Sequence, residues 1–126
     1  MKILESAENY LETIFMLSKT KATVRSIDIA NELNFSKPSV SVAMKNLRTN
    51  GYIDMDHNGH ITLLPEGRAI AEKMYERHTT LTNWLVTLGV SPEIAASDAC
   101  RMEHILSEES YNALRKHVLE SHMKKA

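Results

Sequence analysis

Two short runs of apolar residues, separated by a tight turn and followed at once by a hairpin, constrain the fold of this chain most. Between Ser26 and Leu47 the apolar residues recur at the three- and four-residue spacing of two helices packed across a turn. Small Ala30 fits their closest approach, and Asn34 tolerates the left-handed backbone of the turn. The spacing predicts a helix-turn-helix unit built on Ile29, Ala30, Leu33, Phe35, Val40, Ala43 and Leu47.

The ends of these two helices carry separate signals. Ser26 is expected to cap the first helix, over residues 26–33, because a serine hydroxyl accepts from the backbone of the first turn. The second helix is expected over residues 37–50, with Pro38 tolerated in its first turn and Gly51 ending it.

A β-hairpin is predicted directly after the second helix. Residues 52–56 and 60–64 alternate apolar and polar side chains, and Asn58-Gly59 between them is a strong hairpin signal. A two-stranded ribbon in this position is the wing of a winged helix-turn-helix, with His57, Asn58 and His60 at its tip.

The rest of the chain is predicted to be helical, which makes the fold mainly α. A first amphipathic helix covers residues 6–18, and later helices cover 65–88, 91–106 and 107 to the basic end at Lys124-Lys125. We expect a winged helix-turn-helix domain over residues 1–64 and an all-helical domain over residues 65–126. The first helix is expected to pack across both.

Composition narrows the class of protein. The chain of 126 residues is 43% hydrophobic and 25% charged, as ordinary globular proteins are. No apolar run approaches the roughly 20 residues that span a bilayer, so no membrane association is expected. The start, Met1-Lys2-Ile3-Leu4-Glu5, lacks the apolar core of a signal peptide, and the single cysteine excludes an internal disulfide. A cytoplasmic location is expected.

The charge is uneven although the net charge is only -1. Residues 19–51 hold six cations and two anions, a local balance of +4, which leaves -5 for the remainder. A basic helix-turn-helix with short hydroxyl side chains on its second helix suits phosphates and base edges of double-stranded DNA. The predicted DNA-binding residues are Ser36, Lys37, Pro38, Ser39, Ser41 and Lys45.

A second set of residues points to a metal. Cys100, Glu103 and His104 stand three and four residues apart, so that on a helix they project from one face. A thiolate, a carboxylate and an imidazole can each donate a lone pair to a transition metal. The soft thiolate favours iron(II), cobalt, nickel or zinc over manganese. The later helices also carry more apolar residues than a small half can bury, which predicts a homodimer.

These stretches resemble the diphtheria-toxin-repressor family of iron- and manganese-dependent transcriptional repressors, in its short two-domain form without the SH3-like domain of longer members. The resemblance rests on residues 8–14, the helix-turn-helix and wing, Arg77-His78 and residues 98–107, with Cys100 to His104 the most specific part. It implies that His78, Glu12 and Asn9 join the metal ligands. The family's usual methionine or aspartate is replaced by Asn9, and Thr82 and Ala96 stand where iron sensors carry a second site.

The resemblance implies a repressor activated by Fe(II) that controls metal-uptake genes and reads a palindromic operator as a homodimer. Mn(II) is the alternative effector, for a repressor of manganese transport, and Zn(II), Co(II) or Ni(II) could bind in vitro. Three other classes remain open: a metal-dependent hydrolytic enzyme, a metal-independent winged-helix regulator, and a protein-interaction module. No catalytic scaffold or glycine-rich phosphate loop favours the enzyme.

Overall fold

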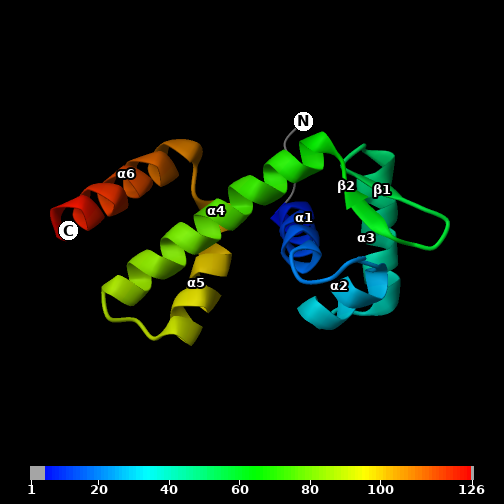
Figure 1. Ribbon diagram of the computed structural model, residues 1–126, viewed down its shortest axis with the longest axis horizontal. Coiled ribbons are helices and arrows are strands. Elements are labelled where there is room, and N and C mark those ends of the chain that lie inside the picture. Colours follow the sequence, from blue (N-terminus) through cyan, green and yellow to red (C-terminus); the bar gives the residue numbers. More distant parts are fainter. Residues whose placement is uncertain (1–4, 126) are drawn as a thin grey trace. The chain divides into compact units, whose positions relative to one another are not determined.

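The computed structural model of the chain describes residues 5–125, and the side chains of residues 5–120. Residues 1–4, from which a cytoplasmic location was partly inferred, lie outside this range, as do the side chains of Lys124 and Lys125. Six helices and a two-stranded sheet follow one another in these residues (Figure 1). The predicted mainly helical fold, with a winged helix-turn-helix before an all-helical region, is confirmed.

The chain divides into two compact units, the first ending at Lys73 and the second beginning at Met74. This division falls inside helix α4, Pro65–Thr87. The expected domain boundary after residue 64 stays a prediction. Each unit is described separately below.

The first unit holds three helices and the hairpin around one apolar core. The helices are α1 (Glu5–Ser18), α2 (Ser26–Leu33) and α3 (Lys37–Thr49), and the strands are β1 (Ile53–Met55) and β2 (Ile61–Leu63). Helix α2 packs on both α1 and α3, while α1 also touches β2 (Figure 1). The side chains buried between them are apolar, including Leu11, Ile14, Ile29, Val40, Met44 and Ile53.

The turn between α2 and α3 follows the sequence prediction, whereas the predicted helix cap does not. Asn34 has a φ of 58°, the left-handed conformation expected there. The prediction that Ser26 caps α2 is wrong, because the cap position is Arg25. The backbone N–H of Arg25 donates to Oδ2 of Asp28 at 2.9 Å, so an acidic side chain from inside the helix closes its first turn.

Two core assignments in the helix-turn-helix also differ from the prediction. Phe35 was expected in the core but is 46% exposed, because it follows the left-handed residue, and its ring meets Tyr10 edge-on at 6.0 Å. Met44 fills the core instead and is fully buried. It lies four residues after Val40 and three before Leu47, on the same buried face of α3.

The hairpin loop is longer than the two-residue turn that Asn58-Gly59 most often forms. The strands pair antiparallel, with Met55 opposite Ile61. Gly59 N–H donates to Asp56 O at 3.0 Å, and Gly59 has a φ of 80°. This is a three-residue loop with the glycine in the left-handed position. The β2 strand is also tied to the segment before α2, since Ile61 N–H donates to Val24 O at 2.7 Å.

The second unit contains the later part of α4 with α5 (Pro92–Ile105) and α6 (Glu108–Lys125). Helices α4 and α6 contact through Tyr111, whose hydroxyl donates to Thr80 Oγ1 at 3.3 Å. Trp84 and His117 meet edge-on between the same helices. The buried apolar side chains of this unit are Met74, Leu81, Ala95, Ala99, Tyr111 and Val118.

Several large apolar side chains of the second unit stay exposed. They include Leu88, Ile94, Ile105 and Leu119, each at least half exposed. Across the part of the chain that the structure describes, no helix is both long and apolar enough to traverse a lipid bilayer.

Candidate functional site

A fully buried carboxylate lies in the second unit. Glu103, on α5, has no exposed surface. Its Oε2 lies 3.3 Å from Nδ1 of His78, on α4, and its Oε1 lies 3.3 Å from Nε2 of His104. The side chain of His104 is 3% exposed and that of His78 is 25% exposed. The structure thus brings together three of the predicted metal ligands from two helices.

Arg77 fixes the end of the helix that carries this carboxylate. The guanidinium is 3% exposed, and its Nη1 donates to the backbone oxygens of Glu103 and Leu106, at 2.9 and 2.8 Å. The carbonyl groups in the last turn of a helix have no partner within the helix, so this side chain satisfies that of Glu103, together with the carbonyl of Leu106 directly after the helix. The ring of Tyr111 lies 4.8 Å from the guanidinium carbon. Arg77 therefore anchors the backbone of Glu103 and lies on α4, the same helix that supplies His78.

The cluster has the character of a cation site. Nδ1 of His78 is buried and makes no hydrogen bond to any described residue, although the carboxylate oxygen is 3.3 Å away. Lone pairs on imidazole and carboxylate repel one another at this distance unless a proton or a cation lies between them. Imidazole and carboxylate groups are common ligands of iron, zinc and manganese. The donor set fits a divalent transition metal.

The remaining predicted ligands lie on two different helices. Cys100 is partly buried on α5, three residues before Glu103 and four before His104, so the helix places all three on one face. Glu12 and Asn9 belong to α1 in the first unit. Glu12 is 4% exposed and Asn9 is partly buried, and one helical turn separates them. Their assignment as ligands stays a prediction.

The sequence reasoning did not give Arg77 a role. A signal was present, because Arg77 falls on the helical stripe that contains Met74 and Leu81, both buried. A charged residue at a buried position of a helix needs partners that replace water. Those partners lie 26 and 29 residues further along the chain, and no local pattern points to them.

The predicted DNA-reading surface lies on the exposed side of α3. Ser36 caps the helix, since its Oγ accepts from the N–H of Ser39 at 3.3 Å, and Pro38 lies in the first turn. All six predicted DNA-binding residues are exposed: Ser36, Lys37, Pro38, Ser39, Ser41 and Lys45. Val42 on the same helix is 61% exposed. The helix therefore offers hydroxyl groups, two lysines and one apolar side chain to a partner.

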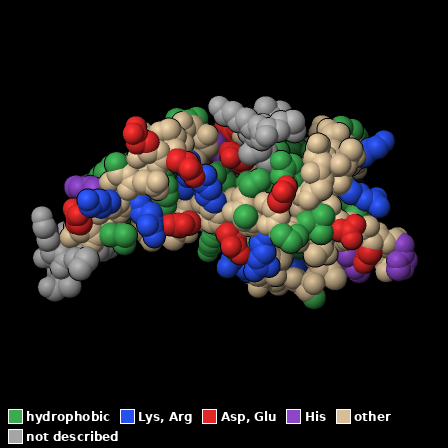
Figure 2. All heavy atoms as spheres, turned by 90° about the horizontal axis from the view of Figure 1, so that it is seen from above, with side chains coloured by type: hydrophobic (Ala, Val, Ile, Leu, Met, Phe, Trp, Pro, Cys, Tyr) green, Lys and Arg blue, Asp and Glu red, His purple; other side chains and the backbone are tan. Residues whose placement is uncertain are grey.

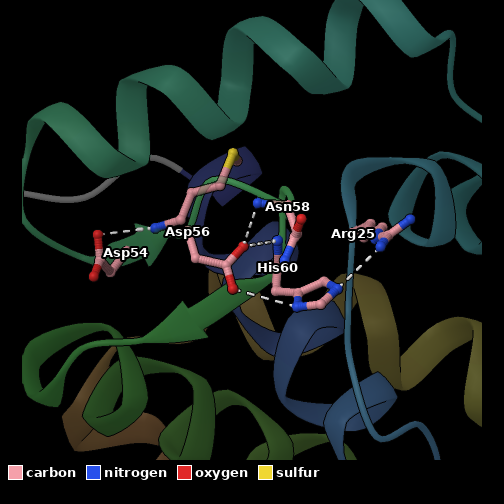
Figure 3. Close-up of polar contacts among 6 residues, drawn as sticks. Arg25, Asp54, Asp56, Asn58 and His60 are labelled. Carbon is pink, nitrogen blue, oxygen red and sulfur yellow. Dashed lines mark hydrogen bonds and ion pairs between the residues drawn. The ribbon is translucent and has the colours of Figure 1, made fainter.

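The wing carries a polar network that the sequence did not predict (Figure 3). Asp56 Oδ1 accepts from the N–H groups of Asn58 and His60, both at 2.9 Å, and Oδ2 lies 3.3 Å from Nδ1 of His60. Nε2 of His60 lies 3.0 Å from Nη2 of Arg25, ahead of α2. The backbone N–H of His60, with that of Asn58 and the nearby histidines, holds the pKa of Asp56 below its ordinary value of 3.8, although desolvation acts in the opposite direction.

The space-filling view shows where these groups lie on the first unit. Figures 1 and 2 share their horizontal axis, and histidine side chains gather in Figure 2 at the end where Figure 1 shows the hairpin loop. Lysine and arginine side chains lie at the same end (Figure 2). The wing and some of the basic side chains thus lie at one end of this unit (Figure 2).

Comparison with known protein families matches both halves of the chain. Residues 2–61 match the profile described as "Iron dependent repressor, N-terminal DNA binding domain". Residues 64–123 match the profile described as "Iron dependent repressor, metal binding and dimerisation domain". The two matches follow one another with a gap of two residues, and together they include every predicted site residue.

Curated relatives include both manganese and iron regulators. The chain is 40% identical over 111 residues to "Transcriptional regulator MntR" of Escherichia coli O157:H7, covering 88% of this chain and 72% of that protein. It is 32% identical to "Iron-dependent repressor IdeR" of Mycobacterium leprae over 85% of this chain and 47% of that protein.

Solved structures that resemble the chain include two manganese-dependent regulators. "Manganese-dependent transcriptional repressor complex with manganese" superposes with a TM-score of 0.82 at 25% identity, covering 89% of this chain and 52% of the other. The structure of the manganese regulator SloR superposes with a TM-score of 0.79, also at 25% identity, and the match covers 53% of that chain. The chain spans about half the length of these solved structures.

Proposed function

Because the chain belongs to the family of iron- and manganese-dependent transcriptional repressors, we propose that it represses metal-uptake genes in the cytoplasm when Fe(II) binds. In this proposal a homodimer reads a palindromic operator, as twofold symmetry of the protein requires. The observation that carries the choice of iron is the thiol of Cys100, on the same face of α5 as Glu103 and His104.

The proposed ligands are Cys100, Glu103, His104 and His78 from the second unit, with Glu12 and Asn9 from the first. Glu103 supports the proposal most strongly, because burial of a carboxylate is costly without compensating charge. The two imidazoles within 3.3 Å of its oxygens supply further lone pairs. A bound divalent ion supplies positive charge for these groups and, with a thiolate among them, the ligand softness of the site favours Fe(II) over Mn(II).

Ligands from both units would couple metal binding to DNA binding. The two readers of a dimer must match adjacent major grooves, about 34 Å apart. Glu12 and Asn9, by joining the ligands of the second unit, would restrict the separations that the readers can adopt. The coupling free energy between two such sites is typically about 1–3 kcal/mol. Because coupling is reciprocal, operator DNA should tighten metal binding by the same factor by which the metal tightens DNA binding.

A manganese-responsive repressor of manganese transport is the second candidate. It is supported by the 40% identity to the regulator named MntR in Escherichia coli. The carboxylates of Glu12 and Glu103 are hard ligands that suit Mn(II). The two candidates differ in the role of Cys100, because a thiolate contributes little to a manganese site.

Titration of metal-stripped chain with Fe(II) or Mn(II) under anaerobic conditions would separate the candidates. The readout is binding to a duplex that carries the chain's own promoter region. Fe(II) is expected to restore binding in the unaltered chain but not in Cys100→Ala, whereas Cys100→Glu is expected to shift the preference toward Mn(II). Zn(II), Co(II) and Ni(II) are further metal ions that could bind in vitro and can be titrated in the same way.

Arg101→Ala is the matched control for these variants. Arg101 is exposed on the same helix and is paired with Asp98 at 2.9 Å, so its loss should leave the metal response intact. Restoration of DNA binding by Mn(II) alone would favour the manganese candidate. Binding to DNA that survives a chelator would instead favour a metal-independent winged-helix regulator. The proposed role involves no catalysis, so hydrolytic turnover by the metal-loaded chain would contradict it.

A further inference from the structure

An exposed arginine ahead of the helix-turn-helix is held by the wing. Arg25 stands at the start of α2, and its Nη2 lies 3.0 Å from Nε2 of His60, which is 35 residues away in the sequence. His60 in turn lies 3.3 Å from Oδ2 of Asp56 through its other ring nitrogen (Figure 3). The three side chains form a line from the wing to the helix-turn-helix.

The direction of each hydrogen bond in this line follows from the chemistry of arginine. A guanidinium only donates and stays protonated at any ordinary pH, so Nε2 of His60 must accept from Arg25 with its lone pair. The proton of the neutral imidazole is then on Nδ1, where it faces the carboxylate of Asp56. Asp56 is itself oriented by the backbone N–H groups of Asn58 and His60. The network therefore selects one tautomer of His60 and one direction for Arg25.

This arrangement holds the guanidinium with a neutral partner instead of a carboxylate. The nearby acidic groups are engaged elsewhere: Asp28 accepts from the backbone of Arg25 and pairs with Lys21 at 3.5 Å, and Asp56 faces the imidazole. His60 takes one of the five N–H donors of the guanidinium. The guanidinium of Arg25 is thus oriented by a neutral partner, which leaves its positive charge available to bind an anion.

We propose that Arg25 contacts a DNA phosphate and that His60 and Asp56 are positioning residues that hold it in place for this contact. The inference rests on the proposed DNA-binding function and extends it to a residue outside the recognition helix. Arg25 stands at the start of α2, which precedes α3, and next to the wing, which follows α3. The wing reaches this point because Ile61 N–H donates to Val24 O at 2.7 Å. A phosphate contact there would fix the register of α3 in the major groove without reading sequence.

The salt dependence of DNA binding tests this contact. Metal-loaded chain is titrated onto a duplex that it selects from a randomised pool, and onto an unrelated duplex of equal length, at several salt concentrations. Arg25→Ala should reduce the slope of log K against log salt by about 0.9, the value for one phosphate, on both duplexes. Arg68→Ala is the matched control, because it removes a cation that Glu72 pairs at 2.8 Å, and its slope should not change.

Variants of His60 separate positioning from general stability. His60→Ala should weaken DNA binding several-fold. Arg25→Ala should then weaken binding less in the His60→Ala background than it does in the unaltered chain. His60→Gln should restore binding, since its amide oxygen can accept from Arg25. Nitrogen chemical shifts of the His60 ring at neutral pH should show the proton on Nδ1. A purely structural role would lower the melting temperature of His60→Ala and leave the coupling to Arg25 at zero.

Each result bears on the inference. An unchanged salt slope in folded Arg25→Ala, with the unaltered chain still binding DNA in the presence of metal, would overturn the phosphate contact and leave the proposed function standing. A proton on Nε2 of His60 would overturn the positioning role. Failure of the metal-loaded chain to bind either duplex would overturn both the contact and the proposed function.

Discussion

The core of the first unit and the core of the second are built from different chemistry. In the first, twelve buried apolar side chains form one cluster, and Glu12 and Thr13 are also buried. In the second, Arg77 and Glu103 are buried among only six apolar side chains. An apolar core is stable by burial alone, whereas buried charges depend on partners. The stability of the first unit should therefore depend mainly on apolar burial, and that of the second unit should depend also on the partners of its two buried charges.

Substitution in the apolar core should have the largest effect on stability. Leu11 is fully buried on α1, so Leu11→Ala should lower the free energy of unfolding of the first unit by about 2–5 kcal/mol through lost burial and the cavity left behind. Urea denaturation of the metal-free chain measures the loss. Met16→Ala, on the same helix but 42% exposed, should change stability by no more than about 0.5 kcal/mol. Equal losses from the two variants would be inconsistent with the apolar core described.

Removal of the buried guanidinium should have a similarly large effect on the second unit. Arg77→Met leaves the backbone oxygens of Glu103 and Leu106 without their donor, so a loss of about 3 kcal/mol is expected. Hydrogen exchange of the α5 amides would show whether this loss of stability falls in the second unit. Arg115→Met is the control, because Arg115 forms an exposed pair with Glu76 and should contribute less than about 1 kcal/mol.

Replacement of the buried carboxylate should separate stability from metal response. Glu103→Leu fills a similar volume without a charge and keeps the backbone oxygen that Arg77 binds, so the metal-free chain should still fold. The unaltered chain should gain about 2.7 kcal/mol when the metal is present at 100 times its dissociation constant, and the variant should gain nothing. Thermal melts with and without Fe(II), under anaerobic conditions, provide the comparison. A full metal-induced gain in the variant would exclude Glu103 as a ligand.

The smallest effect is expected in the wing and depends on pH. The pKa of Asp56 is lower in the folded chain than its ordinary value of 3.8, mainly because the N–H of His60 donates to it. Ionised Asp56 therefore stabilises the wing above that value, and the contribution disappears as the pH falls through the lowered pKa. Asp56→Asn should destabilise the hairpin at pH 7 but differ little from the unaltered chain at a pH well below the lowered pKa, where Asp56 is protonated.

Asp54→Asn is the control for this pH dependence. The Asp54 carboxylate accepts only a local hydrogen bond, from the N–H of Met55. Hydrogen exchange of the β1 and β2 amides at both pH values measures the difference. If the difference in hairpin stability between Asp56→Asn and the unaltered chain increased at the lower pH, the proposed role of ionised Asp56 would be contradicted.

The same contrast explains how far the sequence alone could be read. Apolar spacing located the helix-turn-helix and hairpin to within a residue or two, because burial of an apolar face imposes a period on the sequence. It misassigned Phe35, because the backbone turns at Asn34, and it omitted Met44, which lies on the buried face of α3 with Val40 and Leu47. The choice of Ser26 as a cap was also wrong, because Asp28 reaches back to the backbone from inside the helix.

The polar parts of the molecule were less predictable. Spacing placed Cys100, Glu103 and His104 on one helix face. The family resemblance implied His78 as a further ligand, and its Nδ1 lies 3.3 Å from the carboxylate of Glu103. The hydrogen bonds of Arg77 and the line from Arg25 to Asp56 join residues far apart in the sequence. Such pairs have no period, so only the folded chain identifies them.

Titration of the metal-stripped chain with Co(II), followed by optical absorption, tests the central claim most directly. Cobalt reports its ligands by colour, and a thiolate ligand adds a charge-transfer band. The account predicts this band in the unaltered chain and in Arg101→Ala, its loss in Cys100→Ala, and loss of cobalt binding in Glu103→Gln. An unchanged spectrum in both Cys100→Ala and Glu103→Gln would contradict a metal centre at this cluster.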